Sequence, residues 1–298
     1  AVRSSSLLED AQHHAYAGLY QTYMLPNDAP DLEQRLEHLL QAVKLVYAST
    51  YFQGPRAYAR RVGHRTEEEK MAVIVQQLAG ARQGKYFYPS LSGVAQSRNY
   101  YPQARMKTED GMAAIALGLG KMVVAGERTL RFSPRHPKFL PQRGSVDDIL
   151  SYAQRHFYAL QMETIAPLGL DDGATLLRRE VSDALEEPSV KLLSSTYVAE
   201  EHRIRDTVQI DGPRVLTFAA VLKYGTFPLA GLLQEILAMG EEGMGRPVEI
   251  EFSANLAPEG QEVSEFVILQ MRPMTARAAS AEVTITDEDV AMGSTPPT

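Results

Sequence analysis

The order of its sequence patterns predicts an α+β fold for this chain of 298 residues. The segments 248–252 and 266–273 are expected to be half-buried strands, because apolar and polar residues alternate over 248–252 and over 269–272. A segment with apolar residues at helical spacing covers residues 30–51, far from those strands in the sequence. Strands and helices in such a mixed order favour an α+β fold over a doubly wound parallel sheet.

Two helices are expected in the N-terminal part of the chain. The first covers residues 30–51, with Pro30 near its start. Its apolar residues recur at helical spacing: Leu32, Leu36, Leu39, Leu40, Val43, Val46 and Tyr47. Gly54 and Pro55 break this pattern, and Pro55 can begin the second helix.

Further along the chain, apolar runs punctuated by glycine and proline predict strands, and two longer periodic segments predict helices. The expected strands cover residues 71–78, 85–98 and 121–132. Residues 133–147 are rich in proline and arginine and are expected to form a loop. The two expected helices cover residues 146–161 and 228–242.

Composition excludes several classes of function. The chain has no cysteine, which excludes disulfides, thiolate metal sites and cysteine nucleophiles. Its net charge of −7 argues against nonspecific binding to nucleic acid. No apolar run approaches the length that spans a membrane, and the N-terminus has no basic-then-apolar signal sequence. A cytoplasmic location is therefore expected.

The two strands near the C-terminus carry most of the chemical information. Side chains two residues apart share a face of a strand, so Glu249 and Glu251 lie together, and so do Gln270 and Arg272. The other faces are expected to hold Val248, Ile250 and Phe252 on the first strand and Val267, Leu269 and Met271 on the second. If the strands pair, one surface presents two carboxylates, an amide and a guanidinium. Carboxylates hold Mg²⁺ and arginine grips phosphate, so the pattern suits a metal–polyphosphate site. Solvent-facing charges on an ordinary hairpin would give the same pattern.

These two strands resemble the closing motif of the nucleotide-binding domain of phosphoenolpyruvate synthase and pyruvate phosphate dikinase. In that family a D-I-E-W strand is followed by an I-V-Q-A-R-P-E-T strand. Three more motifs of the family are matched in its order, at residues 2–23, 75–97 and 118–126. They resemble V-R-S-S-x-x-x-E-D…F-A-G-Q-x-E-T-F, V-Q-x-M-V…S-G-V-x-F-T and G-L-G-E-x-V-V-x-G. Four motifs in one order make the resemblance specific as a set.

The resemblance implies an ATP-grasp-like nucleotide-binding domain, in which two α+β subdomains clamp a nucleotide between them. Residues 1–75 would be the remainder of the first subdomain, which is expected to be incomplete because the chain opens inside a family motif. Residues 76–275 would form the second subdomain, with a divergent insertion at about 130–225. Residues 276–298 are expected to form a linker or a disordered tail.

The resemblance also implies roles for residues in the N-terminal half. Arg3 would contact the ATP phosphates and stabilise the charge that develops during transfer, a task that suits a guanidinium. Thr22 would lie near the nucleotide. The backbone of Gln76, Gln77 and Leu78 would read the edge of the adenine.

Near the C-terminus, the matched positions imply metal and phosphate ligands. Glu251 and Gln270 would hold Mg²⁺, and Glu249 would support the nucleotide site as an outer carboxylate. Arg272 would bind the transferring phosphoryl group. One departure reverses a charge: Lys121 stands where the family has glutamate. Lys121 could contact a phosphate, point to solvent or mark a diverged enzyme.

The function that the resemblance implies is the ATP-binding half of a phosphotransferase. ATP and Mg²⁺ are the expected cofactors. The phosphoryl group would pass from ATP to a histidine on a swivelling domain and then to pyruvate, so the phosphohistidine and pyruvate-binding domains of a longer protein are the expected partners. The chain alone is not expected to complete the reaction. Two alternatives are a non-catalytic nucleotide-binding module and a related dikinase with another acceptor.

Overall fold

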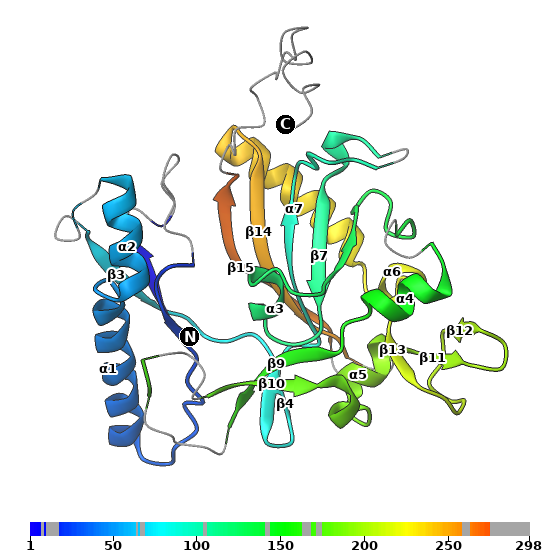
Figure 1. Ribbon diagram of the computed structural model, residues 1–298, viewed down its shortest axis with the longest axis horizontal. Coiled ribbons are helices and arrows are strands. Elements are labelled where there is room, and N and C mark those ends of the chain that lie inside the picture. Colours follow the sequence, from blue (N-terminus) through cyan, green and yellow to red (C-terminus); the bar gives the residue numbers. More distant parts are fainter. Residues whose placement is uncertain are drawn as a thin grey trace, which may run out of the picture.

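The protein has an α+β fold in which a smaller N-terminal lobe faces a larger lobe that holds three sheets (Figure 1). The computed structural model describes residues 1–6, 9, 18–63, 65, 69–103, 106–140, 144–162, 168–170, 175–257 and 263–274. The expected linker or tail at 276–298 lies outside the described residues. Among the helices of the described ranges, none combines the length and apolar character needed to cross a membrane.

The N-terminal lobe is a small antiparallel sheet covered by a long helix. It consists of strands β1 (Val2–Ser6), β2 (Thr22–Tyr23) and β3 (Met71–Val75) and helices α1 (Leu32–Ser49) and α2 (Gln53–Val62). The central strand is β1, with β2 and β3 on either side. Ala42 and Val46 of α1 pack on Val2 and Tyr23 of the sheet.

Both helices of this lobe confirm the prediction from the sequence. Asp31 caps α1, and its side chain accepts a hydrogen bond of 3.1 Å from the backbone N–H of Glu33. Pro55 lies in the first turn of α2, where its missing N–H costs nothing. The inner face of α1 is narrower than its leucine pattern suggests, because Leu32, Leu36 and Leu40 are 69%, 51% and 49% exposed.

The main sheet of the larger lobe has five antiparallel strands. In spatial order they are β15 (Glu265–Pro273), β14 (Val248–Asn255), β6 (Leu91–Gln96), β7 (Met112–Ala116) and β8 (Leu130–Phe132). Helix α7 (Leu229–Met244) packs on one face and contacts β14 and β6. Val248, Ile250 and Phe252 are fully buried on that face, as their alternation predicts.

Two smaller sheets complete the larger lobe. One has the order β10 (Leu176–Glu180), β9 (His156–Gln161), β5 (Tyr86–Tyr88) and β4 (Ala81–Gln83). The other has the order β12 (Arg203–Arg205), β11 (Ser194–Val198) and β13 (Arg214–Leu216). Short helices connect the strands: α3 (Lys121–Val124), α4 (Val146–Tyr152), α5 (Pro188–Leu193) and α6 (Ala219–Leu222), with single 3₁₀ turns at Thr108–Asp110 and Val181–Ala184. One continuous apolar core joins all three sheets.

The helix expected at 146–161 is wrong over its second half. Helix α4 ends at Tyr152, and His156–Gln161 form strand β9. The side chain of Gln154 is buried, and its amide bonds the backbone of Leu117 as a neighbouring strand would. This contact holds residue 154 outside the helix. Its Oε1 accepts from the Leu117 N–H at 2.8 Å, and its Nε2 donates to the Leu117 carbonyl at 3.1 Å.

The strand expected at 121–132 is also wrong over its first part. Lys121–Val124 form the single-turn helix α3, and only Leu130–Phe132 are a strand. The apolar run of this segment fits a helix because Met122 points into the core while Val124 is exposed. A short apolar run cannot by itself distinguish a strand from a buried helical turn.

Strand β15 departs from strict alternation through a β-bulge. Gln270 lies opposite Glu251, but the next residue of β14, Phe252, lies opposite Ile268. Leu269 is therefore the extra residue. The expectation that Val267, Leu269 and Met271 share a face is wrong, because the bulge moves Val267 to the face of Gln270 and Arg272.

Candidate functional site

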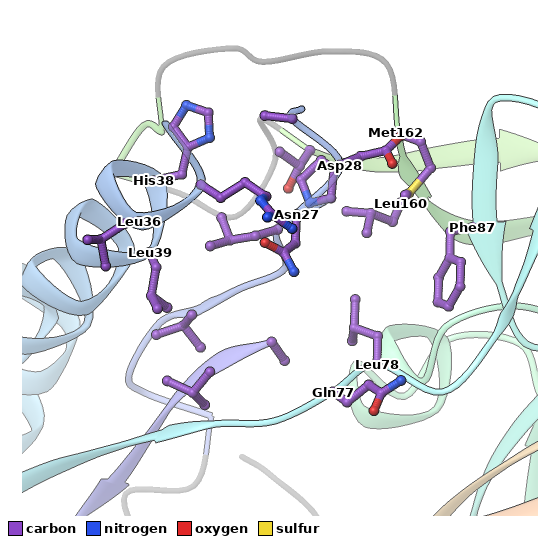
Figure 2. A pocket seen from close by; sticks show the side chains of 18 of the residues that line it. Asn27, Asp28, Leu36, His38, Leu39, Gln77, Leu78, Phe87, Leu160 and Met162 are labelled. Carbon is purple, nitrogen blue, oxygen red and sulfur yellow. The ribbon is translucent and has the colours of Figure 1, made fainter. Parts of the chain in front are cut away.

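A cleft of about 830 Å³ lies between α1 and the sheet that contains β5 and β9. Figure 2 shows Leu36, His38 and Leu39 of α1 on one side and Phe87, Leu160 and Met162 on the other. Gln77 and Leu78 form its floor in this view. Concave sites with mostly apolar walls and few polar groups are typical of small-molecule binding.

The connection between the two lobes borders this cleft. Strand β3 ends at Val75, and the backbone of Gln76 then pairs with Ala1 through hydrogen bonds of 2.9 and 2.7 Å. The Gln76 side chain reaches the other lobe, where its Nε2 donates to the Leu269 carbonyl at 3.2 Å. Gln76, Gln77 and Leu78 all line the cleft, so the three residues expected to read adenine lie along one wall.

A second cavity of about 290 Å³ borders the same segment, since Val75 and Gln76 line both cavities. Arg3, Ser4 and Glu9 line it from the N-terminal lobe, and Leu269 and Gln270 line it from the larger lobe. Arg3 bridges the lobes: its Nη2 donates to Gln270 Oε1 at 2.6 Å. The Arg3 guanidinium therefore lies between the two lobes at the second cavity.

Arg272 lies on the same face of β15 as Gln270 but is not among the described residues that line either cavity, and a carboxylate holds it. Its Nε and Nη2 donate to Glu249 Oε1 at 3.0 and 2.6 Å. The other oxygen of Glu249 accepts from Gln96 Nε2 at 2.6 Å. Both oxygens of Glu249 are thus engaged by side chains of β15 and β6.

Glu251 differs from Glu249 in the contacts of its carboxylate. It lies directly opposite Gln270 and is partly buried. Its carboxylate makes no hydrogen bond or ion pair with any of the residues that the structure describes. A half-buried carboxylate without a partner is costly unless a cation or donor binds it.

These side chains fit a magnesium ion that ATP phosphates also bind. They fit less well a magnesium ion that side chains of the protein bind alone. The described part of the chain contains no group of three or more histidine, aspartate and glutamate residues placed to hold a metal. Mg²⁺ in phosphate-transfer sites typically uses one or two carboxylates, with phosphates and waters as the other ligands. Glu251 supplies such a carboxylate, and Gln270 brings an amide beside it whose oxygen accepts from Arg3.

Thr22 and Lys121 lie farther from the cavities. Thr22 pairs with Arg3 across β1 and β2, but it is not among the described residues that line either cavity. The Nζ of Lys121 lies 5.3 Å from the centre of the Tyr158 ring, a cation–π contact. The loop before Lys121 nevertheless joins the polar face of the sheet, because Ser92 Oγ donates to the Gly118 carbonyl at 2.5 Å.

Two contacts of the site were not predicted from the sequence. Gln96 was part of a matched motif, but the pairing of β6 with β14 is what brings its amide to Glu249. Leu269 was expected on an apolar face, whereas the bulge leaves its carbonyl as the acceptor for Gln76. The family motif gave no signal for either contact, since both depend on strand register.

Comparisons with known proteins relate residues 1–291 to one protein family. A family model described as "Pyruvate phosphate dikinase, AMP/ATP-binding domain" matches residues 1–291. A curated protein of Bacillus subtilis (strain 168), described as the uncharacterized phosphotransferase YvkC, is 30% identical over 129 residues. That alignment covers 43% of this chain and 13% of the relative, so the chain spans a small part of that protein's length.

Proposed function

The chain belongs to the family of AMP/ATP-binding domains of pyruvate phosphate dikinase, and we propose that it binds Mg²⁺-ATP between its two lobes. In this proposal the chain is the phosphoryl-donor half of a larger phosphotransferase. The single observation that supports the site best is that one segment borders both cavities. Gln76 lines the cleft that Gln77 and Leu78 also line, and it lines the cavity that Arg3 and Gln270 line.

In this proposal the base occupies the larger cavity. An extended backbone at Gln76–Leu78 and apolar walls from Phe87 and Leu160 suit a purine, since backbone groups can bond its edge and side chains can cover its faces. Thr22 contributes near the nucleotide through its pairing with Arg3.

The phosphates then lie against Arg3, Arg272 and the Glu251–Gln270 pair. The bound metal supplies charge neutralisation on the phosphate oxygens. Arg3 and Arg272 add fixed positive charge and fork-shaped donors where negative charge is shared among the oxygens. Glu249 supports this arrangement by holding the Arg272 guanidinium. Phosphoryl transfer needs mainly positioning and electrostatic stabilisation, which these residues can supply.

The proposed acceptor is a histidine on a separate swivelling domain of the full-length protein, which passes the phosphoryl group to pyruvate in a cytoplasmic reaction. The family and the word "phosphotransferase" in the name of the relative support the donor half of this route. The identity of the final acceptor is the part of the proposal that rests on family resemblance alone.

Calorimetric titration with ATP, in Mg²⁺ and in EDTA, tests the proposal on the chain itself. Glu251→Gln keeps the shape of the side chain and removes its charge. We expect it to weaken Mg²⁺-ATP binding by roughly tenfold or more, about 1.4 kcal/mol, and to change binding in EDTA much less.

Glu242→Gln, on the exposed surface of α7, is the matched control and should bind as the parent chain does. Equal affinity of the parent and Glu251→Gln in Mg²⁺ would remove Glu251 from the metal site. Absence of Mg²⁺-ATP binding by the parent chain would contradict the proposed function as a whole.

A further inference from the structure

We propose that Gln96 is a positioning residue for phosphoryl transfer, because it fixes the Glu249 carboxylate that in turn holds Arg272. This inference rests on the proposed function, since it assigns Arg272 to the terminal phosphate of ATP. Nothing in the family motif singles out Gln96. It is the geometry of three adjacent strands that connects it to the site.

The three side chains form one hydrogen-bonded row across the sheet. Gln96 pairs with Glu249 between β6 and β14, and Glu249 pairs with Arg272 between β14 and β15. Residues directly opposite each other in antiparallel strands point to the same face. Gln96 Nε2 donates to one oxygen of Glu249 at 2.6 Å, and Arg272 donates to the other at 2.6 and 3.0 Å.

The orientation of the Gln96 amide follows from chemistry. An ionised carboxylate only accepts hydrogen bonds, so the amide must turn its NH₂ group toward Glu249. With one oxygen engaged by Gln96, the carboxylate cannot rotate without breaking a short charged hydrogen bond. Its remaining oxygen therefore presents a fixed acceptor to the guanidinium.

The backbone of Gln96 is held as firmly as its side chain. The strand β6 lies inside the five-stranded sheet and pairs with β14 and β7. Gly111, with a φ of 67°, approaches so closely that a Cβ there would lie 2.8 Å from the Gln96 carbonyl oxygen. A positioning group on a rigid central strand is more precise than one on a loop.

The neighbouring carboxylates of Glu249 and Glu251 therefore have different roles. Glu249 accepts hydrogen bonds from Arg272 and Gln96, whereas Glu251 has no such partner among the residues that the structure describes. Without Gln96, the Glu249–Arg272 pair is free to change rotamers, and Arg272 loses its fixed place at the phosphates. The nucleotide most affected is the one that carries the phosphate that Arg272 contacts.

The test compares the preference for Mg²⁺-ATP over Mg²⁺-ADP by calorimetry in a double-mutant cycle. We expect Gln96→Leu to lower this preference by roughly tenfold while the affinity for Mg²⁺-ADP stays unchanged. Arg272→Ala should lower the preference at least as much. On the Arg272→Ala background, Gln96→Leu should change it by less than about twofold, because the residue that Gln96 positions is then missing.

Gln209→Leu, in an exposed loop, is the matched control for a glutamine-to-leucine change. Gln96→Met, with an unbranched side chain of similar length, replaces Gln96→Leu if urea unfolding shows that the leucine variant is destabilised. A merely structural glutamine would weaken ATP and ADP binding together, so the ratio separates the two roles.

The outcomes distinguish the inference from the proposed function. If Arg272→Ala lowers the ATP preference and Gln96→Leu does not, the inference is overturned and the proposed function stands. Additive losses in the double variant also overturn the inference. If Arg272→Ala leaves the preference unchanged, the proposed role of Arg272 fails, and the role of Gln96 fails with it.

Discussion

Close packing decides the identity of Gly93, at the centre of the sheet that carries the site. A Cβ on this residue would lie 2.4 Å from the Phe252 ring and 2.7 Å from the Ala114 carbonyl oxygen. The motif around residues 92–97 identifies the glycine, but its sequence context is equally compatible with a tight turn. In the structure Gly93 lies within strand β6, so its role is to admit a neighbouring ring and backbone.

Gly93→Ala should therefore destabilise the chain. Neither the ring of Phe252 nor the backbone of Ala114 can yield freely, so we expect a loss of about 1–3 kcal/mol in the free energy of unfolding. Urea denaturation measures it. Gly54→Ala in α2 is the control, because a Cβ there meets nothing within 4 Å and alanine favours the helix. Equal stability of the two variants would show that β6 adjusts to the added methyl group.

At the scale of elements, sequence patterns predicted some strands and missed the feature that shapes the site. The alternation of Val248, Ile250 and Phe252 identifies the buried face of β14 because that face is regular. The extra residue of β15, Leu269, ends a run of four apolar residues at 266–269, and such a run does not show which residue is the bulge. Pairing with β14 sets the register, and pairing is a property of two segments rather than one.

Deletion of Leu269 should remove the bulge without exchanging the faces of β15. Ile268 and Gln270 would become neighbours, still opposite Phe252 and Glu251. We expect the cooperative unfolding transition to remain, while Mg²⁺-ATP affinity falls because Gln76 loses the carbonyl that joins the lobes. Calorimetry and urea unfolding together measure both effects. Leu269→Ala keeps the bulge and its carbonyl and should bind as the parent does. Parental affinity in the deletion variant would contradict a role for the bulge.

Asp206 follows strand β12 directly, and its side chain is 18% exposed. Asp206 accepts hydrogen bonds from Lys223 Nζ at 2.6 Å, Tyr224 Oη at 2.9 Å and Ser195 Oγ at 3.2 Å. Burial alone would raise its pKa, but these hydrogen bonds and the charge of Lys223 hold the pKa of Asp206 below its usual 3.8. Because the pKa is lower in the folded state, this acid stabilises the fold above pH 3.8 and stops doing so as the pH falls through the folded pKa.

Asp206→Asn should lower the free energy of unfolding by about 1–2 kcal/mol at pH 7, where charged hydrogen bonds are lost. The difference between the parent chain and the variant should narrow as the pH falls below 3.8. Thermal unfolding from pH 3 to pH 7, with Asp211→Asn in an exposed loop as control, measures it. A difference that stays constant over this pH range would exclude the ionised carboxylate as its source.

At the scale of the whole molecule, the site depends on contacts between segments far apart in the sequence. Arg3 contacts Gln270, and Gln76 contacts Leu269, so both hydrogen bonds join the N-terminal lobe to the larger lobe. Family resemblance predicted these segments as parts of one site, whereas composition and periodicity alone did not place them together. The structure also gives Glu249 and Glu251 different environments, which their equal spacing in the sequence could not show.

The structure of the region at about 130–225 was only partly predicted from the sequence. It contains β8 to β13 and the helices α4, α5 and α6 within the described ranges, and it contributes to the walls of the larger cavity through Leu160, Met162 and Thr175. Its short strands alternate weakly, and contacts such as that of Gln154 with Leu117 determine their ends. Tertiary contacts of this kind override local propensity and leave no periodic trace.

A crystal structure of the chain with Mg²⁺ and a non-hydrolysable ATP analogue tests the central claim most directly. We expect the adenine in the larger cavity beside Gln76–Leu78. We expect the metal against Glu251 and the terminal phosphate within reach of Arg3 and Arg272. A nucleotide bound away from both cavities, or phosphates directed away from Arg3 and Arg272, would contradict the proposed binding mode.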